Sequence, residues 1–161
     1  MKLLRLSILV FLLVTTCTLS AQSYHSSIGL RFGYPLSVAY KVFLNERDAV
    51  EGYVGYRGFG YSRAFSLNAA YLIHQDFDTV DRLQWYYGGG AGIQFWDYDD
   101  YSGSTTLGIS GYLGLEYIVT DAPLTITLDW RPTLFIGTQR TPGFNSLGGF
   151  YGGIGMRYII D

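Results

Sequence analysis

Residues 106–132 hold the most constraining pattern in this chain. From Leu107 to Tyr117, every second residue is apolar except for one glycine, and the residues between are Gly, Ser, Tyr and Glu. After a short break at 120–123 the alternation resumes and runs through 124–131. A period of two in neighbouring segments with a turn between them predicts an antiparallel β-hairpin.

The polar face of this hairpin has an unusual composition for a water-facing sheet. It consists mostly of Gly, Ser and Thr, with the isolated charges Glu116, Asp129 and Arg131. Small side chains with single charges suit a confined space in which opposite charges can meet. The apolar face is continuous and carries no charge. We therefore expect the apolar face to contact lipid and the polar face to line a narrow barrel.

The same alternation recurs along the chain after residue 21, where no helix signal is present. The strands that it predicts are 28–33, 36–43, 49–59, 63–74, 83–96, 107–117, 124–131 and 149–160. Eight is an even number and the smallest usual size for a membrane barrel, and it places both termini on one side. The expected fold is all-β, an eight-stranded antiparallel up-and-down transmembrane β-barrel.

Three local features fit this expectation. The glycine run 88–90 lets a small sheet coil and leaves room for inward aromatic side chains. Pro132 must lie where its strand needs no ladder hydrogen bond, or at a bulge. Aromatic residues near the strand ends predict interfacial girdles, formed by Tyr34, Tyr56, Tyr61, Trp85, Trp96, Tyr117, Trp130 and Tyr158.

The first 21 residues have the pattern of a cleavable signal peptide. Lys2 and Arg5 precede the apolar run 6–14, which is too short to span a bilayer as a helix. We place the cut after Ala21, so that residues 22–161 form the barrel domain. The single cysteine, Cys17, falls in the removed segment, so the mature chain has no disulfide or thiolate chemistry.

The mature charge excludes nucleic acid as a partner class. Without Lys2 and Arg5 the chain keeps 9 of its 11 basic residues against 13 acidic ones, a net charge of −4. The sequence contains no basic patch that could track a phosphate backbone.

Charged residues on the expected inner face are the candidate functional residues. Unpaired charges in so narrow an interior would cost several kcal/mol each, so we predict an ion-pair network that plugs the lumen. The alternative is an ion path or a small-solute site. The inward charges are Arg31, Lys41, Glu51, Arg57, Glu116, Asp129, Arg131 and Arg157.

Catalytic, metal and cofactor sites are weakly supported. His25 precedes the first strand and His74 ends the fourth, where we expect an exposed residue at the periplasmic rim. A lipid-modifying enzyme of the outer leaflet would need its histidine and nucleophile at the other rim. The acidic stretch 97–100 lacks the spacing of a calcium loop, and no helix or Lys-Ser/Thr pair follows the glycines at 88–92. We predict no enzyme activity, cofactor or metal.

Several motifs resemble small outer-membrane β-barrel proteins of Gram-negative bacteria, of the Bacteroidetes type and with an OmpA/OmpX-like architecture. They are WYYGGGA at 85–91, GLEY at 114–117, DAPL at 121–124 and LDWRP at 128–132. The last strand also resembles the signal read by the barrel-assembly machinery, through Tyr151, Gly153, Met156 and Tyr158. It departs from that signal by ending in Ile-Ile-Asp instead of an aromatic residue.

The resemblance implies a location in the cell outer membrane, with membrane lipid and the assembly machinery as partners, and it supplies no catalytic residues. We expect a monomeric, non-enzymatic barrel with a structural or surface-interaction role. The alternatives are a porin-like channel for ions or small solutes, a soluble periplasmic barrel with its apolar face inward around an apolar ligand, and a lipid-modifying barrel enzyme.

Overall fold

The structure is a computed structural model that describes residues 24–33, 35–59, 62–98, 101–137 and 152–160. The predicted signal peptide and the predicted strand residues 149–151 lie outside these ranges. Within them, no helix is long and apolar enough to cross a membrane. The strands are β1 (Ser26–Gly33), β2 (Leu36–Phe43), β3 (Asp48–Phe59), β4 (Ser62–Asp76), β5 (Leu83–Tyr98), β6 (Tyr101–Ile118), β7 (Leu124–Trp130), β8 (Thr133–Gly137) and β9 (Gly152–Ile160).

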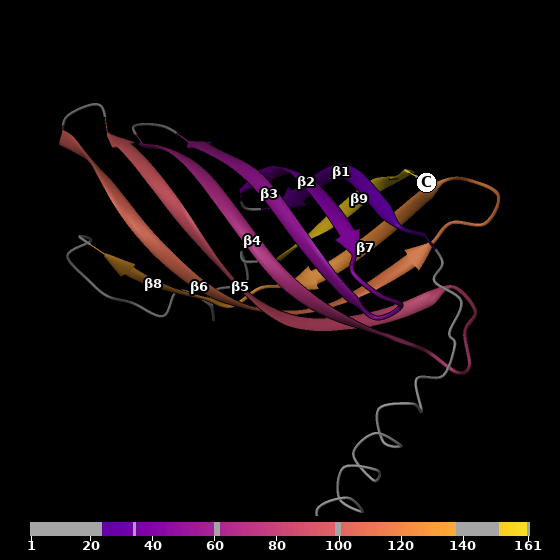
Figure 1. Ribbon diagram of the computed structural model, residues 1–161. Helices are drawn as coiled ribbons and strands as arrows, with labels where there is room; N and C mark the ends of the chain where they lie inside the picture. The colour runs from indigo at the N-terminus through magenta and orange to yellow at the C-terminus, as the bar shows by residue number, and fades with distance from the viewer. Residues whose placement is uncertain (1–23, 34, 60–61, 99–100, 138–151, 161) are drawn as a thin grey trace, which may run out of the picture.

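The strands form one closed antiparallel barrel (Figure 1). From β1 to β7 each strand pairs with the next one in the chain, β9 pairs with β7, and β1 pairs with β9 from Ser26↔Ile160 to Gly33↔Gly153 to close the wall. β7 and β8 pair with successive parts of β6, so they are two halves of one strand and the wall has eight. The predicted fold class is confirmed.

Pro132 explains why the seventh wall strand is divided. Proline has no N–H to donate, and residues 131–132 leave the ladder between β7 and β8. The Pro132 carbonyl still accepts a hydrogen bond from the Gly111 N–H of β6 at 2.9 Å. The strand therefore continues past the proline to Gly137, which is farther than the alternation in the sequence predicted.

The barrel has two unequal ends. We call the end with the start of β1 and the end of β9 the terminal end, and the opposite one the mouth end. β4, β5 and β6 are the longest strands, and the β5–β6 pair reaches farthest at the mouth end (Figure 1). The pairing of Tyr98 with Tyr101 extends β5 and β6 beyond their predicted limits.

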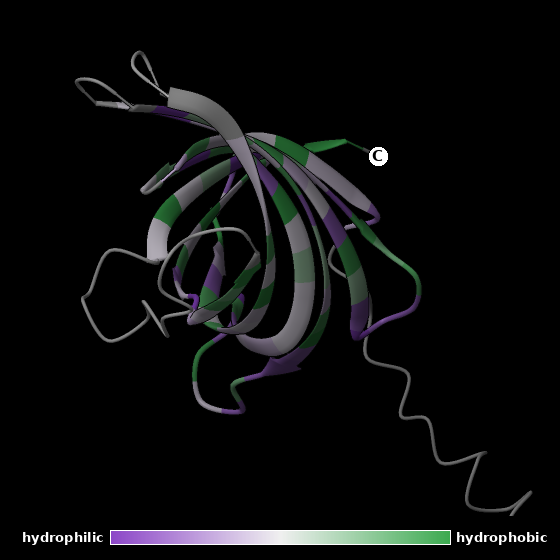
Figure 2. Cartoon of the chain, turned by 90° about the vertical axis from the view of Figure 1, so that its left-hand side faces the viewer, coloured by the Kyte–Doolittle hydropathy of each residue, from purple (hydrophilic) through white to green (hydrophobic). Residues whose placement is uncertain are grey.

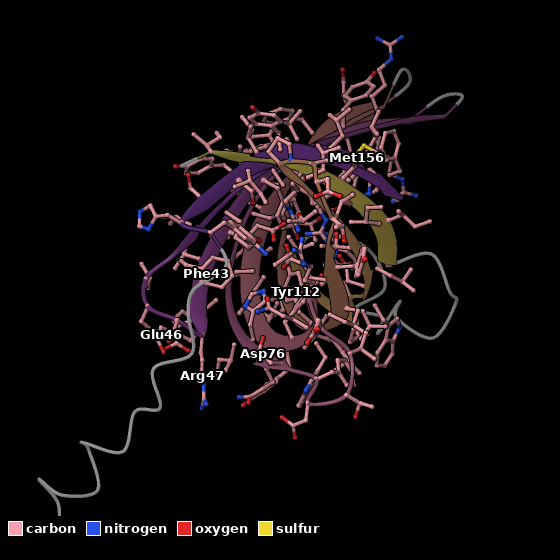
Figure 3. All side chains as sticks on the ribbon, turned by 90° about the vertical axis from the view of Figure 1, so that its right-hand side faces the viewer. Phe43, Glu46, Arg47, Asp76, Tyr112 and Met156 are labelled. Carbon is pink, nitrogen blue, oxygen red and sulfur yellow. The ribbon has the colours of Figure 1, made fainter. Side chains whose placement is uncertain are left out.

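Side chains alternate between the two faces of the wall as the sequence pattern predicted. Hydrophobic and hydrophilic segments alternate along the strands (Figure 2), and side chains fill the space inside the ring of strands (Figure 3). Leu107, Leu113 and Ile126 are 54%, 48% and 43% exposed, whereas Glu116 and Arg131 are 0% and 8% exposed. The apolar face is therefore the outer one, and a barrel with its apolar face inward is ruled out.

The girdle prediction is wrong for Trp96. Trp96 pairs with Ala64, which is buried on the inner face, and its ring lies under the Arg57 guanidinium at 4.8 Å. The exposed aromatics Tyr56, Trp130 and Tyr158 do lie on the outer face. Tyr34 and Tyr61 lie outside the described residues.

Gly114 shows why small residues are needed on the inner face. It lies on β6 between Tyr86 of β5 and Asp129 of β7 in the pairing register. The Tyr86 ring crosses over Gly114 to reach Asp129, so a Cβ at position 114 would lie 2.4 Å from Tyr86 Cζ. An inward tyrosine therefore occupies the space that a side chain at 114 would need.

Replacing Gly114 with alanine is predicted to destabilise the barrel by about 1–3 kcal/mol, because the added methyl group overpacks the interior and moves Tyr86 off Asp129. The measurement is the free energy of unfolding in urea in lipid vesicles. Gly52→Ala is the matched control, since nothing lies within 4 Å of a Cβ built there. Its stability should be unchanged or higher by up to about 1 kcal/mol. Equal losses in the two variants would contradict the packing of Tyr86 over Gly114.

Candidate functional site

The inner face holds a column of polar and aromatic side chains. At the terminal end it begins with an apolar layer in which Tyr24, Phe43, Ala49 and Ile118 are buried together. The Tyr24 and Phe43 rings pack edge to face, with centroids 5.0 Å apart. Tyr24 lies just before β1, so the segment that leads into the barrel helps to cover its terminal end.

The next layer is centred on the Glu116 carboxylate of β6. Lys41 of β2 donates to Glu116 Oε2, and the Tyr24 hydroxyl donates to Glu116 Oε1 at 2.6 Å. His74 Nε2 lies 3.3 Å from Glu116 Oε2 and 3.4 Å from Lys41 Nζ. The Lys41 ammonium also lies over the Phe43 ring, 5.0 Å from its centroid. Burial, and then the Glu116 charge, raise the pKa of Tyr24 well above its usual value, so Tyr24 stays a neutral donor.

His74 corrects one expectation from the sequence. We expected an exposed residue at a strand end, but His74 is 1% exposed and sits inside the barrel, with its Nδ1 3.3 Å from the Arg47 carbonyl. The reason is that β4 continues to Asp76, so position 74 still belongs to the alternation and points inward. His25 is exposed, as expected.

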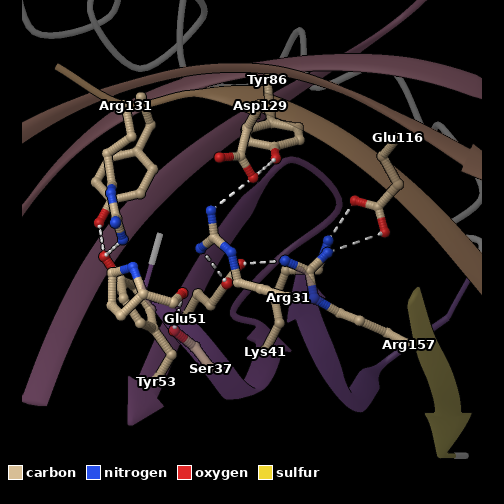
Figure 4. A network of polar contacts seen from close by, with 12 residues as sticks. Arg31, Ser37, Lys41, Glu51, Tyr53, Tyr86, Glu116, Asp129, Arg131 and Arg157 are labelled. Atoms are coloured by element: carbon tan, nitrogen blue, oxygen red, sulfur yellow. Dashed lines mark hydrogen bonds and ion pairs between the residues drawn. The ribbon is translucent and has the colours of Figure 1, made fainter. Parts of the chain in front are cut away.

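The central layer contains four of the eight predicted charges, Arg31, Glu51, Asp129 and Arg157 (Figure 4). Glu51 of β3 accepts from Arg157 at 2.8 Å and from Arg31 at 2.9 Å. Arg31 also donates to Asp129 Oδ2 at 2.6 Å, and the Tyr86 hydroxyl donates to the same oxygen at 3.1 Å. These groups come from five strands, β1, β3, β5, β7 and β9. The layer therefore ties opposite parts of the wall together across the lumen.

Two tyrosines and an arginine lie on the mouth side of this layer. The Tyr53 and Tyr112 hydroxyls are 2.5 Å apart, and Arg131 donates to the Tyr53 hydroxyl. The guanidinium groups of Arg31 and Arg131 lie over the Tyr53 ring, 4.9 Å and 5.2 Å from its centroid. Tyr53 therefore links the central ion pairs to Arg131.

The structure places the eight predicted site residues as follows. Six take part in the ion pairs above, namely Arg31, Lys41, Glu51, Glu116, Asp129 and Arg157. Arg131 joins them through Tyr53, and Arg57 lies nearer the mouth over Trp96. Each of the three carboxylates is thus paired with at least one cation inside the lumen. Among the described residues, no three His, Cys, Asp or Glu side chains are grouped to hold a metal.

Sequence reasoning did not assign Tyr24, His74 or Tyr86 as a partner of these charges. Tyr86 and His74 fall on the inward positions of their strands, so their parity could have identified them. Tyr24 precedes the first strand, and no periodic signal marked it as a partner of Glu116.

Taken together, the wall and its interior define an all-β, closed eight-stranded antiparallel barrel with an apolar outer face and a charged inner one. No family model matches the chain, and no curated protein matches it. Among solved structures, the crystal structure of neisserial surface protein A (NspA) is similar, with a TM-score of 0.52 and 16% sequence identity. The match covers 84% of this chain and 93% of that one. At this identity the similarity shows the fold.

Removing one partner of the central layer should cost more than removing a pair. Asp129→Leu leaves Arg31 and Tyr86 without an acceptor they use in the folded barrel, and we expect a loss of about 3–5 kcal/mol in the free energy of unfolding. The double variant Arg31→Met/Asp129→Leu removes one charge of each sign and should lose less. Asp81→Leu, in the exposed β4–β5 turn, is the control and should stay within about 0.5 kcal/mol.

Urea titration in lipid vesicles compares the parent chain with these three variants and with the single variant Arg31→Met. If Asp129→Leu unfolds at the same urea concentration as the parent chain, the Arg31–Asp129 pair does not stabilise the barrel. A double variant that loses as much as the two single variants combined would show that the two side chains are not coupled.

Proposed function

We propose that this chain is a monomeric outer-membrane protein whose lumen is plugged by its own ion pairs. Its role is structural or in surface interaction, without enzyme activity. The observation that carries the proposal is the arrangement of the wall. Among the residues that the structure describes, a continuous outer band of exposed aliphatic and aromatic side chains surrounds an interior in which seven charged residues are buried. Water would favour the opposite arrangement, whereas hydrocarbon favours this one.

The signal-peptide pattern and the pattern of the last strand support a location in the outer membrane. The predicted signal peptide, 1–21, would deliver it across the inner membrane, and the last strand carries most of the pattern that the barrel-assembly machinery reads. The terminal end would then face the periplasm and the mouth end the cell exterior. NspA, the solved structure with a similar fold, is named a surface protein, which supports a similar location for this chain.

Several contacts favour a closed lumen over a pore. Side-chain contacts cross the interior at three successive levels. These are the layer around Glu116, the central layer around Glu51 and the Tyr53–Tyr112 pair. Eight strands enclose a space that side chains can fill, which supports a plugged lumen. We therefore favour the plug over a channel for ions or small solutes.

Catalysis is disfavoured by the positions of the two histidines. His74 is sealed among Lys41, Glu116 and Phe43, and His25 lies by the terminal end. A lipid-modifying barrel enzyme would carry out its reaction in the outer leaflet, at the mouth end. Neither histidine is there.

The first test of the proposal is fractionation of cells that express the full chain. The mature protein should sediment with outer membranes, stay insoluble in buffer and migrate differently on a gel before and after boiling. In planar bilayers the purified barrel should give no stable conductance steps. Steady ion currents would favour the channel, and extraction by buffer alone would contradict membrane insertion.

A substitution on the outer face separates a lipid-facing wall from a water-facing one. Leu67 is exposed between Val54 and Ile93 in the pairing register. Leu67→Arg should lower the free energy of unfolding from vesicles by about 2–4 kcal/mol if position 67 lies near the bilayer centre. Val80→Arg, in the exposed β4–β5 turn, is the control and should have little effect. If Leu67→Arg is as stable as Val80→Arg, the wall does not face hydrocarbon.

A further inference from the structure

Tyr24 does not follow the alternation of the strand that it precedes. In β1 the side chains of Ile28 and Leu30 are exposed on the outer face, and Tyr24 belongs to the same set of alternate residues. Its side chain is nevertheless only 4% exposed and lies inside the barrel. The ladders of β1 with β2 and β9 begin at Ser26. The chain therefore bends over the rim between the paired wall and Tyr24, and the ring turns into the lumen.

The Tyr24 ring reaches across the terminal end of the lumen. Tyr24 comes from the β1 side, whereas Glu116, which accepts its hydroxyl hydrogen at 2.6 Å, belongs to β6. Between β1 and β6 the wall has two strands in one direction, β9 and β7, and four in the other. The ring also packs edge to face on Phe43 of β2, with the centroids 5.0 Å apart. Tyr24 thus connects three separate parts of the wall.

The Tyr24 ring lies against Lys41, the lysine of the layer around Glu116. The Lys41 ammonium lies over two rings, 5.3 Å from the Tyr24 centroid and 5.0 Å from the Phe43 centroid. It is fully buried and donates to Glu116. The sequence contains two lysines, and the predicted cut removes Lys2. Lys41 is therefore the only lysine of the mature chain.

The segment that carries Tyr24 is held less firmly than the wall. Its backbone is tied to β2 at His25, whose carbonyl accepts a hydrogen bond from the Phe43 N–H at 2.9 Å. The β1 residues 26–31, in contrast, lie between two ladders. The side chain of Tyr24 adds its hydrogen bond to Glu116 and its ring contacts with Phe43 and Lys41. A segment held by few contacts opens at a lower free energy than the whole domain unfolds.

We propose that Tyr24 is a lid on the terminal end of the lumen, and that it opens by a local movement while the wall stays paired. Opening breaks the hydrogen bond to Glu116, withdraws the ring from Phe43 and exposes Lys41 to water. Closing restores the plug. In the orientation proposed above, the lid faces the periplasm. The proposal goes beyond the proposed function, since it requires only the folded barrel.

Acylation of the single lysine measures how often the lid is open. The mature barrel in detergent is treated with a small water-soluble reagent, sulfo-N-hydroxysuccinimide acetate, and acetylation of Lys41 is followed by peptide mass spectrometry. Trypsin cleaves after Arg31, so the α-amine at the start of the chain lies on a different peptide. Lys41 should react slowly, at a rate that does not change at urea concentrations well below unfolding, because a local opening exposes little surface.

Three variants assign the reaction to the lid. Tyr24→Phe keeps the ring but loses the hydrogen bond to a carboxylate, and Lys41 should react about 10- to 100-fold faster. Tyr24→Ala also loses the ring contacts and should react faster still. Tyr112→Phe is the matched control, because it removes a buried phenol hydroxyl on the mouth side of the central layer. It should keep the parent rate. The heat-dependent gel shift shows which variants form the barrel.

Two results would overturn the lid. The first is a parent rate that follows the unfolding curve from the lowest urea concentrations, which would mean that Lys41 is reached only when the wall unfolds. This measurement needs no variant. The second is a folded Tyr24→Phe barrel whose Lys41 reacts no faster than that of Tyr112→Phe. Neither result would bear on whether the barrel inserts in the outer membrane.

Discussion

Glu51 is the residue on which the interior of this barrel depends. Its two oxygens receive Arg31 and Arg157 from β1 and β9, the strands that close the wall. A carboxylate buried to this extent is tolerated only because both oxygens are paired, and removing either arginine would leave charge in a low-dielectric space. Closure of the barrel and pairing of the buried Glu51 charge therefore depend on the same two arginines, Arg31 and Arg157.

The remaining contacts extend from this pair in both directions. Arg31 carries the network to Asp129 and Tyr86, and the position of Tyr86 requires glycine at 114. Arg157 lies 4.0 Å from Glu116, which connects the central layer to the layer that contains Lys41. The buried contacts therefore connect the wall strands at successive levels of the barrel.

The sequence predicts the wall well because the wall depends on a local rule. Side chains of a strand point alternately to its two faces. In this chain one set of alternate residues is apolar and the other carries the charges, so period two alone predicts the fold class, the strand order and the faces on which Leu107 and Glu116 lie. Six of the predicted inward charges meet for the same reason: a narrow lumen leaves them few other partners. The prediction is weaker at strand ends, where β4 continues past His74 and places it inside.

Pairings across the lumen could not be derived from the sequence. Which carboxylate receives Arg31 depends on strand tilt and on how far each side chain reaches, and neither is encoded in the alternation. Tyr24 lies outside any strand, so its bond to Glu116 depends on how the leading segment folds back. We assigned Trp96 to the girdle because it is an aromatic residue near a strand end. Its position in the strand alternation and its contact with Arg57 place it on the inner face instead.

The central claim is that one face of every strand meets lipid and the other a sealed interior. Spin labels on single cysteines along β6, in a chain that begins at Gln22 and so has no other cysteine, test it most directly. In vesicles, labels at Leu107, Ile109 and Leu113 should collide with oxygen dissolved in the bilayer and be shielded from a water-soluble nickel complex. A label at Ser110 should be shielded from lipid. The opposite alternation, with the leucine positions reached by the nickel complex, would contradict the account.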